Sequence, residues 1–400
     1  MKKLQSYDVF KPGAFPEYTY ISRISSELMF TYEFRLKQAL NTPGYLTSII
    51  GPSKTGKTVL CEKVIGLDNM ISLTGSDFKN STNFWEVIAT KLGLVVEGEY
   101  SKVNTSKESI NEENMRIKSI ASRDRYLANK DTIIDYFKNN NLVLVLDDFH
   151  YASEELQFDI AYQLKDAIRK ELKAIVISLP HRADDAIRKN ADLSGRLNLI
   201  NIEPWKKEEL KKIAITGFDK LGIEITDIFA EKIAIESLTS PQLMQSICLN
   251  LSLISNIDEV NELDMTLLDK SYKFTTINLP YKEVVKKLKS GPSTRGQKRK
   301  TYKIDGEHDL DVYGIILKAI ASDPPLISIT IDELKNRVDH LMVNIEDKLD
   351  KNKLKKTLQA IQDIMTNSEA IYQVFEWKDE QIYILEPLFL FYIRWGVNRK

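Results

Sequence analysis

The stretch GPSKTGKT at residues 51–58 limits what this chain can fold into more than any other stretch. It matches the pattern G-x-x-x-x-G-K-[ST] at every fixed position, and it lies between the apolar run YLTSII and a helical pattern. Glycines let backbone amides curl around phosphates, and the start of the following helix attracts anions. Lys57 offers a positive charge to the β- and γ-phosphates, and Thr58 offers a hydroxyl to Mg²⁺. Strand, loop and helix together favour a nucleotide site over a glycine-rich turn that binds nothing. The predicted nucleotide-binding residues are Gly51, Pro52, Ser53, Lys54, Thr55, Gly56, Lys57, Thr58 and Val59.

A second motif, LVLVLDDFH, ends an apolar run at residues 142–150. An uninterrupted apolar run is typical of a strand buried on both faces. Asp147 would hold Mg²⁺ through water, and Asp148 would orient or deprotonate the attacking water. The alternative is a pair of acids that stabilise the start of the next helix. His150 either forms a hydrogen bond near the site or caps that helix, and the sequence does not choose.

Strand-like runs alternate with helical patterns in the first half of the chain, which predicts a parallel sheet covered on both faces. The expected strands are 45–50, 70–75, 142–147, 174–179 and 197–202. Residues 97–130 are rich in charge, serine and asparagine, and we expect an insertion with some helix near its end. Three consecutive helices are expected over residues 206–254.

The C-terminal part has three helical patterns followed by the probable hairpin strands AIYQVFEW and QIYIL, which is the element order of a winged helix. The segment before it contains the basic run GPSTRGQKRKTYK. The predicted domains are a nucleotide-binding core (1–204), a helical lid (205–255), a linker with a basic loop (256–310) and a winged helix (311–400).

Composition excludes several classes of protein. Lysine plus arginine number 56 and aspartate plus glutamate 57, so any basic surface must be local. Two cysteines form no disulfide framework, and no Cys/His cluster has metal-ligand spacing. No apolar run approaches the roughly 18–20 residues that span a bilayer, and the N-terminal apolar stretch is too short for a signal peptide. We therefore expect a cytoplasmic protein.

The paired motifs, five-strand core, helical lid and C-terminal winged helix resemble the AAA+ and STAND group of P-loop ATPases. Archaeal origin-initiator ATPases share this order of parts, as do bacterial ATP-binding proteins, some of them found in antiphage defence. The resemblance implies an α/β fold with sheet order 5-1-4-3-2, and ATP and Mg²⁺ as ligands.

The resemblance also implies roles for further residues. Ser178, at the tip of the fourth strand, would sense the γ-phosphate. Arg196, before the fifth strand, would reach a neighbour's nucleotide, unless it is a surface arginine. Tyr20 lies where relatives build an adenine pocket, although such aromatics are also common in cores. The family's lid often carries an arginine near the start of its third helix, where this chain has Gln242, and that difference weakens a motor-like interpretation.

The sequence does not decide what two basic segments bind. The loop could meet nucleic-acid phosphates, fold back on a nucleotide phosphate, or remain a solvated linker; its residues are Arg295, Lys298, Arg299, Lys300 and Lys303. The start of the third predicted winged-helix helix carries four lysines that suit a groove-reading helix, Lys351, Lys353, Lys355 and Lys356. The predicted wing, EWKDEQ, holds three acids, which do not suit a phosphate-facing wing.

The favoured function is an ATP-dependent molecular switch that hydrolyses slowly, self-associates and controls a partner effector protein. The Asp-Asp-Phe-His sequence, the missing lid arginine and the absence of a visible effector domain favour it. Antiphage defence is a setting suggested by resemblance alone. The alternatives are a DNA-loading ATPase, similar to initiators or transposition regulators, and a nucleotide-binding adaptor with negligible hydrolysis.

Overall fold

The computed structural model describes residues 3–74, 77, 83–94, 97–108, 116–127, 129–148, 154–179, 193, 195–260, 262–293, 296, 298–304, 309–344, 348–368 and 373–396. The chain forms two compact units. The sheet unit comprises Ile24–Gly51 and Lys57–Ile202. The helical unit comprises Met1–Arg23, Pro52–Gly56 and Glu203–Lys400.

The sheet unit is built on a five-stranded parallel sheet. Its strands are β1 (Leu46–Ile50), β2 (Met70–Thr74), β5 (Val143–Asp147), β6 (Ala174–Ser178) and β7 (Leu197–Asn201). Their order is β2-β5-β6-β1-β7, which is the predicted order 5-1-4-3-2 counted from the other edge. The predicted fold class of this part is therefore confirmed, and the carboxyl ends of all five strands lie at one edge.

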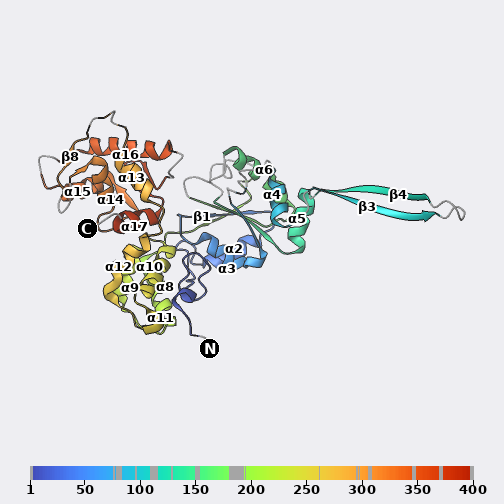
Figure 1. The fold of residues 1–400 in the computed structure, drawn as a ribbon, viewed down its shortest axis with the longest axis horizontal. Helices are drawn as coiled ribbons and strands as arrows, with labels where there is room; N and C mark the ends of the chain where they lie inside the picture. Colours follow the sequence, from blue (N-terminus) through green and yellow to red (C-terminus); the bar gives the residue numbers. More distant parts are fainter. Residues whose placement is uncertain are drawn as a thin grey trace. The chain divides into compact units, whose positions relative to one another are not determined.

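Helices cover both faces of this sheet (Figure 1). One core packs Leu144 and Leu146 against α4 (Phe84–Lys91), α5 (Lys130–Asn139) and α6 (Glu154–Arg169). The other core packs Val143 and Val145 against α2 (Tyr32–Leu40) and α3 (Lys57–Ile65), which is followed by the short helix η1 (Leu67–Asn69). Successive residues of β5 thus enter opposite cores, and each buried side chain contributes roughly 1.5–3 kcal/mol. This burial on both faces explains why the run at 142–146 has no polar residue.

The insertion is a two-stranded antiparallel ribbon that extends away from the sheet (Figure 1). Its strands are β3 (Glu97–Glu108) and β4 (Arg116–Leu127), paired over their whole length. The expectation of helix near the end of the insertion is wrong, because β4 continues to Leu127 and α5 begins at Lys130. The segment has too few apolar residues to form the buried face that a packed helix needs. Pairing between β3 and β4 instead satisfies the backbone hydrogen-bonding groups on the facing edges of the two strands.

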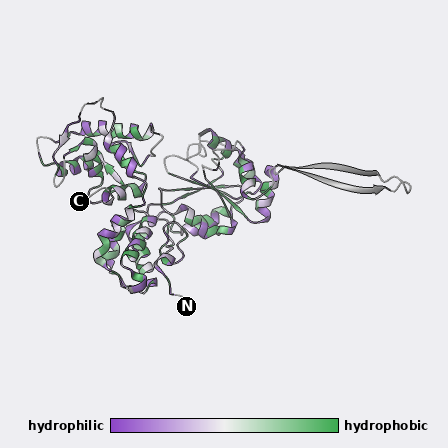
Figure 2. Ribbon diagram, in the orientation of Figure 1, coloured by the Kyte–Doolittle hydropathy of each residue, from purple (hydrophilic) through white to green (hydrophobic). Residues whose placement is uncertain are grey.

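The helical unit contains the three predicted consecutive helices, α8 (Lys207–Lys220), α9 (Asp227–Glu236) and α10 (Pro241–Ile254). The short helix α1 (Ser6–Val9) precedes them in the chain. The stretch predicted to be a linker with a basic loop contains α11 (Ile257–Val260), η4 (Met265–Leu267), α12 (Leu268–Thr276) and α13 (Lys282–Ser290). Along the helices of Figure 2, hydrophobic and hydrophilic residues alternate, as they do in helices that bury one face. Within the described ranges, every helix is too short or too polar to cross a bilayer.

The C-terminal segment, residues 309–396, contains the three predicted helices and the hairpin. Its elements are β9 (Leu310–Asp311, paired with β8, Thr301–Tyr302), α14 (Val312–Ile320), β10 (Ser328–Thr330), α15 (Ile331–Leu341), α16 (Lys351–Thr366), β11 (Phe375–Lys378), β12 (Gln381–Ile384) and α17 (Pro387–Trp395). Strand β10 was not predicted, and it pairs with β12 to complete a three-stranded sheet in the order β10-β12-β11.

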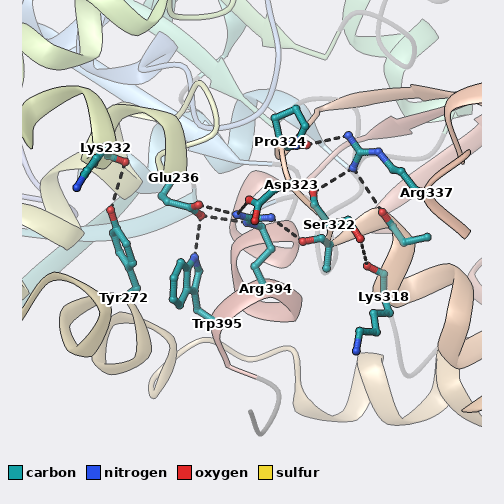
Figure 3. Close-up of polar contacts among 12 residues, drawn as sticks. Lys232, Glu236, Tyr272, Lys318, Ser322, Asp323, Pro324, Arg337, Arg394 and Trp395 are labelled. Carbon is teal, nitrogen blue, oxygen red and sulfur yellow. Dashed lines mark hydrogen bonds and ion pairs between the residues drawn. The ribbon is translucent and has the colours of Figure 1, made fainter. Parts of the chain in front are cut away.

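A buried ion pair joins α17 to α9 (Figure 3). Arg394 Nε and Nη2 donate to the two carboxylate oxygens of Glu236, at 3.0 and 2.6 Å, and Trp395 Nε1 donates to the same carboxylate at 2.7 Å. Arg394 Nη1 also donates to the Ala321 carbonyl at 2.6 Å. The two charged side chains are only 5% and 11% exposed. The pair therefore fixes α17 against α9 with a defined geometry.

We predict that Arg394→Met lowers the free energy of unfolding by about 3–5 kcal/mol, because it leaves the Glu236 carboxylate buried without its partner. Adding Glu236→Leu to this variant removes both charges and recovers most of the loss. Urea unfolding followed by tryptophan fluorescence measures both effects. Lys207→Ala, which breaks the half-exposed pair with Glu231 on the same helix α9, is the control and changes stability by less than about 1 kcal/mol. A single variant as stable as the wild type would show that the pair contributes nothing.

Candidate nucleotide-binding site

The predicted phosphate loop leaves the sheet at the carboxyl end of β1. Gly51 N donates to the carbonyl of Ser178 at 3.3 Å, which places the start of the loop beside the end of β6. A Cβ atom on Gly51 would lie 2.8 Å from the carbonyl oxygen of Ile202, so only glycine fits there. Gly56 has φ +86° and Lys54 has φ +60°. Gly56 adopts this left-handed conformation without steric cost, whereas Lys54 adopts it despite its side chain.

Lys57 is the first residue of α3 and is only 9% exposed. Its ammonium donates to the Gly51 carbonyl at 2.9 Å, so the side chain folds back across the loop. The first amides of a helix have no partner within that helix, and they present positive charge at the same point. Ammonium and amides together form the anion-binding arrangement that the sequence motif predicts.

Thr58 and Asp147 meet at the end of β5. The Thr58 hydroxyl donates to Asp147 Oδ2 at 2.6 Å, and the Asp148 amide donates to Asp147 Oδ1 at 2.9 Å. A hydroxyl and a carboxylate at this separation suit Mg²⁺, which prefers oxygen ligands and usually adds phosphates and water to one or two protein groups. Within the described ranges, no group of three or more His, Cys, Asp or Glu side chains is arranged to hold a metal. The Thr58 hydroxyl and the Asp147 carboxylate are the oxygen groups that fit a magnesium ion here.

Asp148 and Ser178 complete this edge of the sheet. Asp148 directly follows β5, is exposed, and has a left-handed backbone with φ +50°. Ser178 is the last residue of β6, is 2% exposed, and pairs with Ile50 at the end of β1. The sheet topology therefore brings the ends of β1, β5 and β6 to one edge, where Asp148 supplies a carboxylate and Ser178 a hydroxyl.

Glu62 was missed by the sequence analysis, although its spacing gave a signal. It lies four residues after Thr58 on α3, so the two side chains share one face of the helix. Burial and the nearby charge of Asp147 raise the pKa of Glu62 above its usual value. Burial, followed by Asp147 and Glu62, also raises the pKa of the Cys61 thiol, which is therefore unreactive. Negative charge thus accumulates where a divalent cation would bind.

The middle of the loop, Pro52–Gly56, belongs to the helical unit and is held by residues distant in the sequence, to which no sequence signal pointed. Trp205 Nε1 donates to the Thr55 carbonyl at 2.9 Å, and the Arg23 guanidinium lies 4.6 Å from the centre of the Trp205 ring. Ser53 Oγ donates to Glu386 Oε1 at 3.2 Å. These bonds fix one carbonyl and one hydroxyl of the loop, so its middle is positioned by residues outside the motif.

Arg196 does not lie at this edge of the sheet. Its carbonyl accepts from the amide of Leu46, the first residue of β1, whereas the loop follows the last residue of that strand. Five strand residues at about 3.3 Å each place roughly 16 Å between the two edges. The side chain of Arg196 is half-buried and directly precedes β7, as predicted. Arg196 is therefore on the wrong edge to act on its own chain's loop.

The remaining predicted residues lie elsewhere. Tyr20 belongs to the helical unit and stacks on Phe15 with ring centres 5.7 Å apart. Arg299 donates to the carbonyls of Ser290 and Pro292 and forms an ion pair with Asp311 at 3.3 Å, so it braces its own loop. Two predicted residues, His150 and Arg295, lie outside the described residues.

Several solved structures are similar to this chain over most of its length. A Walker-type ATPase of Pyrococcus abyssi is 13% identical, with 94% of this chain and 99% of that chain covered and a TM-score of 0.49. The ORC2 protein of Aeropyrum pernix, in ADPNP–ADP complexes, is 13% identical, with 94% and 95% covered and a TM-score of 0.46. Cdc6p from Pyrobaculum aerophilum is 13% identical, with 96% and 94% covered and a TM-score of 0.43. No protein-family model and no curated protein matches the chain.

Proposed function

We propose that this chain binds ATP with Mg²⁺ and hydrolyses it slowly. The observation that carries the proposal is the 2.6 Å hydrogen bond between Thr58 and Asp147. Thr58 directly follows Lys57, whose ammonium group folds back onto the Gly51 carbonyl at the start of the loop. Thr58 and Asp147 would hold the cation, which supplies positive charge against the phosphate oxygens. Lys57 and the loop amides bind the phosphates, and Asp148 accepts a proton from the attacking water or orients that water.

We further propose that the chain acts as a switch and that ATP promotes its self-association. Two features support this. The start of α10, Ser240–Gln242, is a neutral helix cap in which Ser240 accepts from the Leu243 amide, and it carries no cation that could respond to the γ-phosphate. Arg196 lies at the sheet edge opposite its own loop, where a second copy could use it. The output then passes to a partner effector protein, and antiphage defence is the setting that we propose from the resemblance.

Phosphate release by purified protein tests the catalytic roles. We expect Lys57→Ala to reduce it by about 10²-fold or more, because a charge aimed at the phosphates is lost. Asp148→Asn reduces it by about 10²–10⁴-fold and leaves ATP binding intact, because only proton transfer is affected. Lys63→Ala, an exposed lysine on the same helix α3, is the charge-matched control and keeps the wild-type rate. Equal rates in all four proteins would favour a binding adaptor, and tens of turnovers per second by the wild type would contradict a slow switch.

Size-exclusion chromatography of Asp148→Asn tests the switch. Because this variant retains ATP, we expect it to elute as a larger species with ATP·Mg²⁺ and as the smaller species with ADP or no nucleotide. Lys57→Ala should elute as the smaller species in every condition. If Asp148→Asn remains a monomer with ATP at micromolar concentration, self-association is wrong, while hydrolysis by the wild type would remain established by phosphate release.

A mixing experiment tests whether Arg196 acts on a second copy. Arg196→Ala alone should hydrolyse about 10³–10⁵-fold more slowly, as expected for a trans-acting arginine. Asp148→Asn alone is also impaired, but it retains Arg196. In a mixed oligomer this arginine can reach the nucleotide site of the Arg196→Ala variant, in which Asp148 is intact. An equimolar mixture of the two inactive variants should therefore recover activity, and a mixture as inactive as its components would contradict the role.

The elevated pKa of Glu62 predicts that Glu62→Gln increases thermal stability by an amount that depends on pH. A carboxyl group whose pKa is raised in the folded state destabilises the fold once it ionises, so its penalty is absent at low pH and complete above the raised pKa. In metal-free protein we expect Glu62→Gln to raise the thermal midpoint near neutral pH, with the gain vanishing toward about pH 4, where glutamate is ordinarily protonated. Glu155→Gln, an exposed glutamate on α6, should show no such trend. A gain that is the same at every pH would show that the charge is not the cause.

A further inference from the structure

Helix α13 presents a row of lysines on one face. Lys282, Lys286 and Lys289 occur at spacings of four and three residues, and all three are exposed. At 1.5 Å per residue the row is about 10 Å long. The opposite face is buried through Val284, Val285 and Leu288. Core packing therefore fixes the helix while the lysines face water.

A second basic segment lies against the end of this helix. Arg299 donates to the carbonyl of Ser290, the last residue of α13, and its guanidinium lies 4.8 Å from the Tyr313 ring centre. Lys298 and Lys300 flank Arg299 in the chain and are both exposed. Arg299 thus ties its loop to the C-terminal end of α13. We use the name lysine face for these exposed lysines of the two segments: Lys282, Lys286, Lys289, Lys298 and Lys300.

Within the described ranges, four of the five lysines of the lysine face form no ion pair, and the exposed acid Glu283 lies beside Lys282 in the first turn of α13. In the part of the chain that the structure describes, no ion pair involves Lys282, Lys286, Lys289 or Lys298. The overall charge of the chain is −1, so this local excess is not a consequence of composition. Uncompensated lysines held in a row attract a polyanion whose charges are also regularly spaced.

The helix that the sequence favoured for this purpose is less suitable. On α16, Lys351 forms an ion pair with Asp332, and Lys355 forms one with Glu380 between the hairpin strands. Two of its four lysines are therefore neutralised, by acids from α15 and from the turn between β11 and β12. A phosphate that approached this helix would have to displace those carboxylates.

We propose that the lysine face binds the phosphate backbone of a nucleic-acid duplex, without reading its sequence. Lysine binds phosphate as a point charge, whereas base reading usually requires arginine or amide side chains in a groove. Single-strand binding instead needs exposed aromatic rings for base stacking. The aromatic residues next to the lysine face are buried, with Tyr281, Tyr302 and Tyr313 only 3%, 5% and 8% exposed. The proposal does not depend on the nucleotide site.

The test uses the full chain and a labelled DNA duplex of about 30 base pairs and arbitrary sequence, with affinity measured across salt concentrations by fluorescence anisotropy. Removing three phosphate contacts should reduce the magnitude of the slope of log K against log salt by about 2 to 3. The variant that removes them is the triple substitution Lys282→Gln, Lys286→Gln and Lys289→Gln. An exposed-lysine control with the same charge change is Lys212→Gln, Lys220→Gln and Lys270→Gln. A third variant, Lys353→Gln with Lys356→Gln, tests the exposed lysines of α16.

The proposal is supported if the α13 variant has a lower duplex affinity and a shallower slope of log K against log salt, while the other two variants match the wild type. It is overturned if the α16 variant alone loses binding, or if all three variants lose it equally. It is also overturned if the wild type binds no duplex at low salt, binds only single strands, or binds anionic vesicles but no duplex. A duplex RNA of the same length extends the test, since the same lysines should govern both. Lys57→Ala should keep its duplex affinity in nucleotide-free buffer, so failure of the nucleotide proposal and failure of this one are distinguishable.

Discussion

The close approach of Gly51 to Ile202 is the constraint on which the candidate site depends. At this point β1 becomes the phosphate loop and the chain leaves β7, and the Ile202 amide also donates to the Ile50 carbonyl at 2.6 Å. The absence of a side chain on Gly51 lets the two backbones meet. Because this contact fixes where the loop begins, it also fixes where Lys57 and Thr58 begin α3. The position of the chain at the end of the edge strand β7 thus limits where the loop can begin, through contacts of the Gly51 and Ile50 backbone with Ile202.

The sequence was sufficient for the parts of the molecule whose signals are local. A strand covered on both faces must be apolar along its length, so the run before Asp147 could be recognised, and the loop motif has fixed positions. The helix α13 has only three buried apolar residues among its lysines, which is why the surrounding stretch resembled a linker. The bonds from Trp205 to Thr55 and from Ser53 to Glu386 join residues 150 and 333 positions apart. No periodicity or spacing in a single sequence encodes such contacts.

Charge shows the same limit. From the sequence, four lysines at the start of α16 and three acids in the following hairpin were two separate observations with opposite implications. In the structure the two sets of charges are partly paired with each other, because Glu380 from the hairpin forms an ion pair with Lys355. Counting charges by segment therefore misjudged which basic surface is available. The lysines of α13 drew no attention because their segment had no predicted element, yet among the described residues no ion pair involves Lys282, Lys286 or Lys289.

The left-handed backbone at Asp148 has a consequence for how this site could have changed in evolution. Aspartate and asparagine tolerate positive φ because their short polar side chains form local hydrogen bonds, whereas longer residues incur a cost of roughly 1–2 kcal/mol. The identity of residue 148 is therefore set by the turn as well as by the chemistry. A glutamate introduced there would incur this cost, as Glu171 and Glu380 already do at φ +69° and +59°. A change of residue 148 would thus alter the stability of the turn after β5 together with the position of the acidic group.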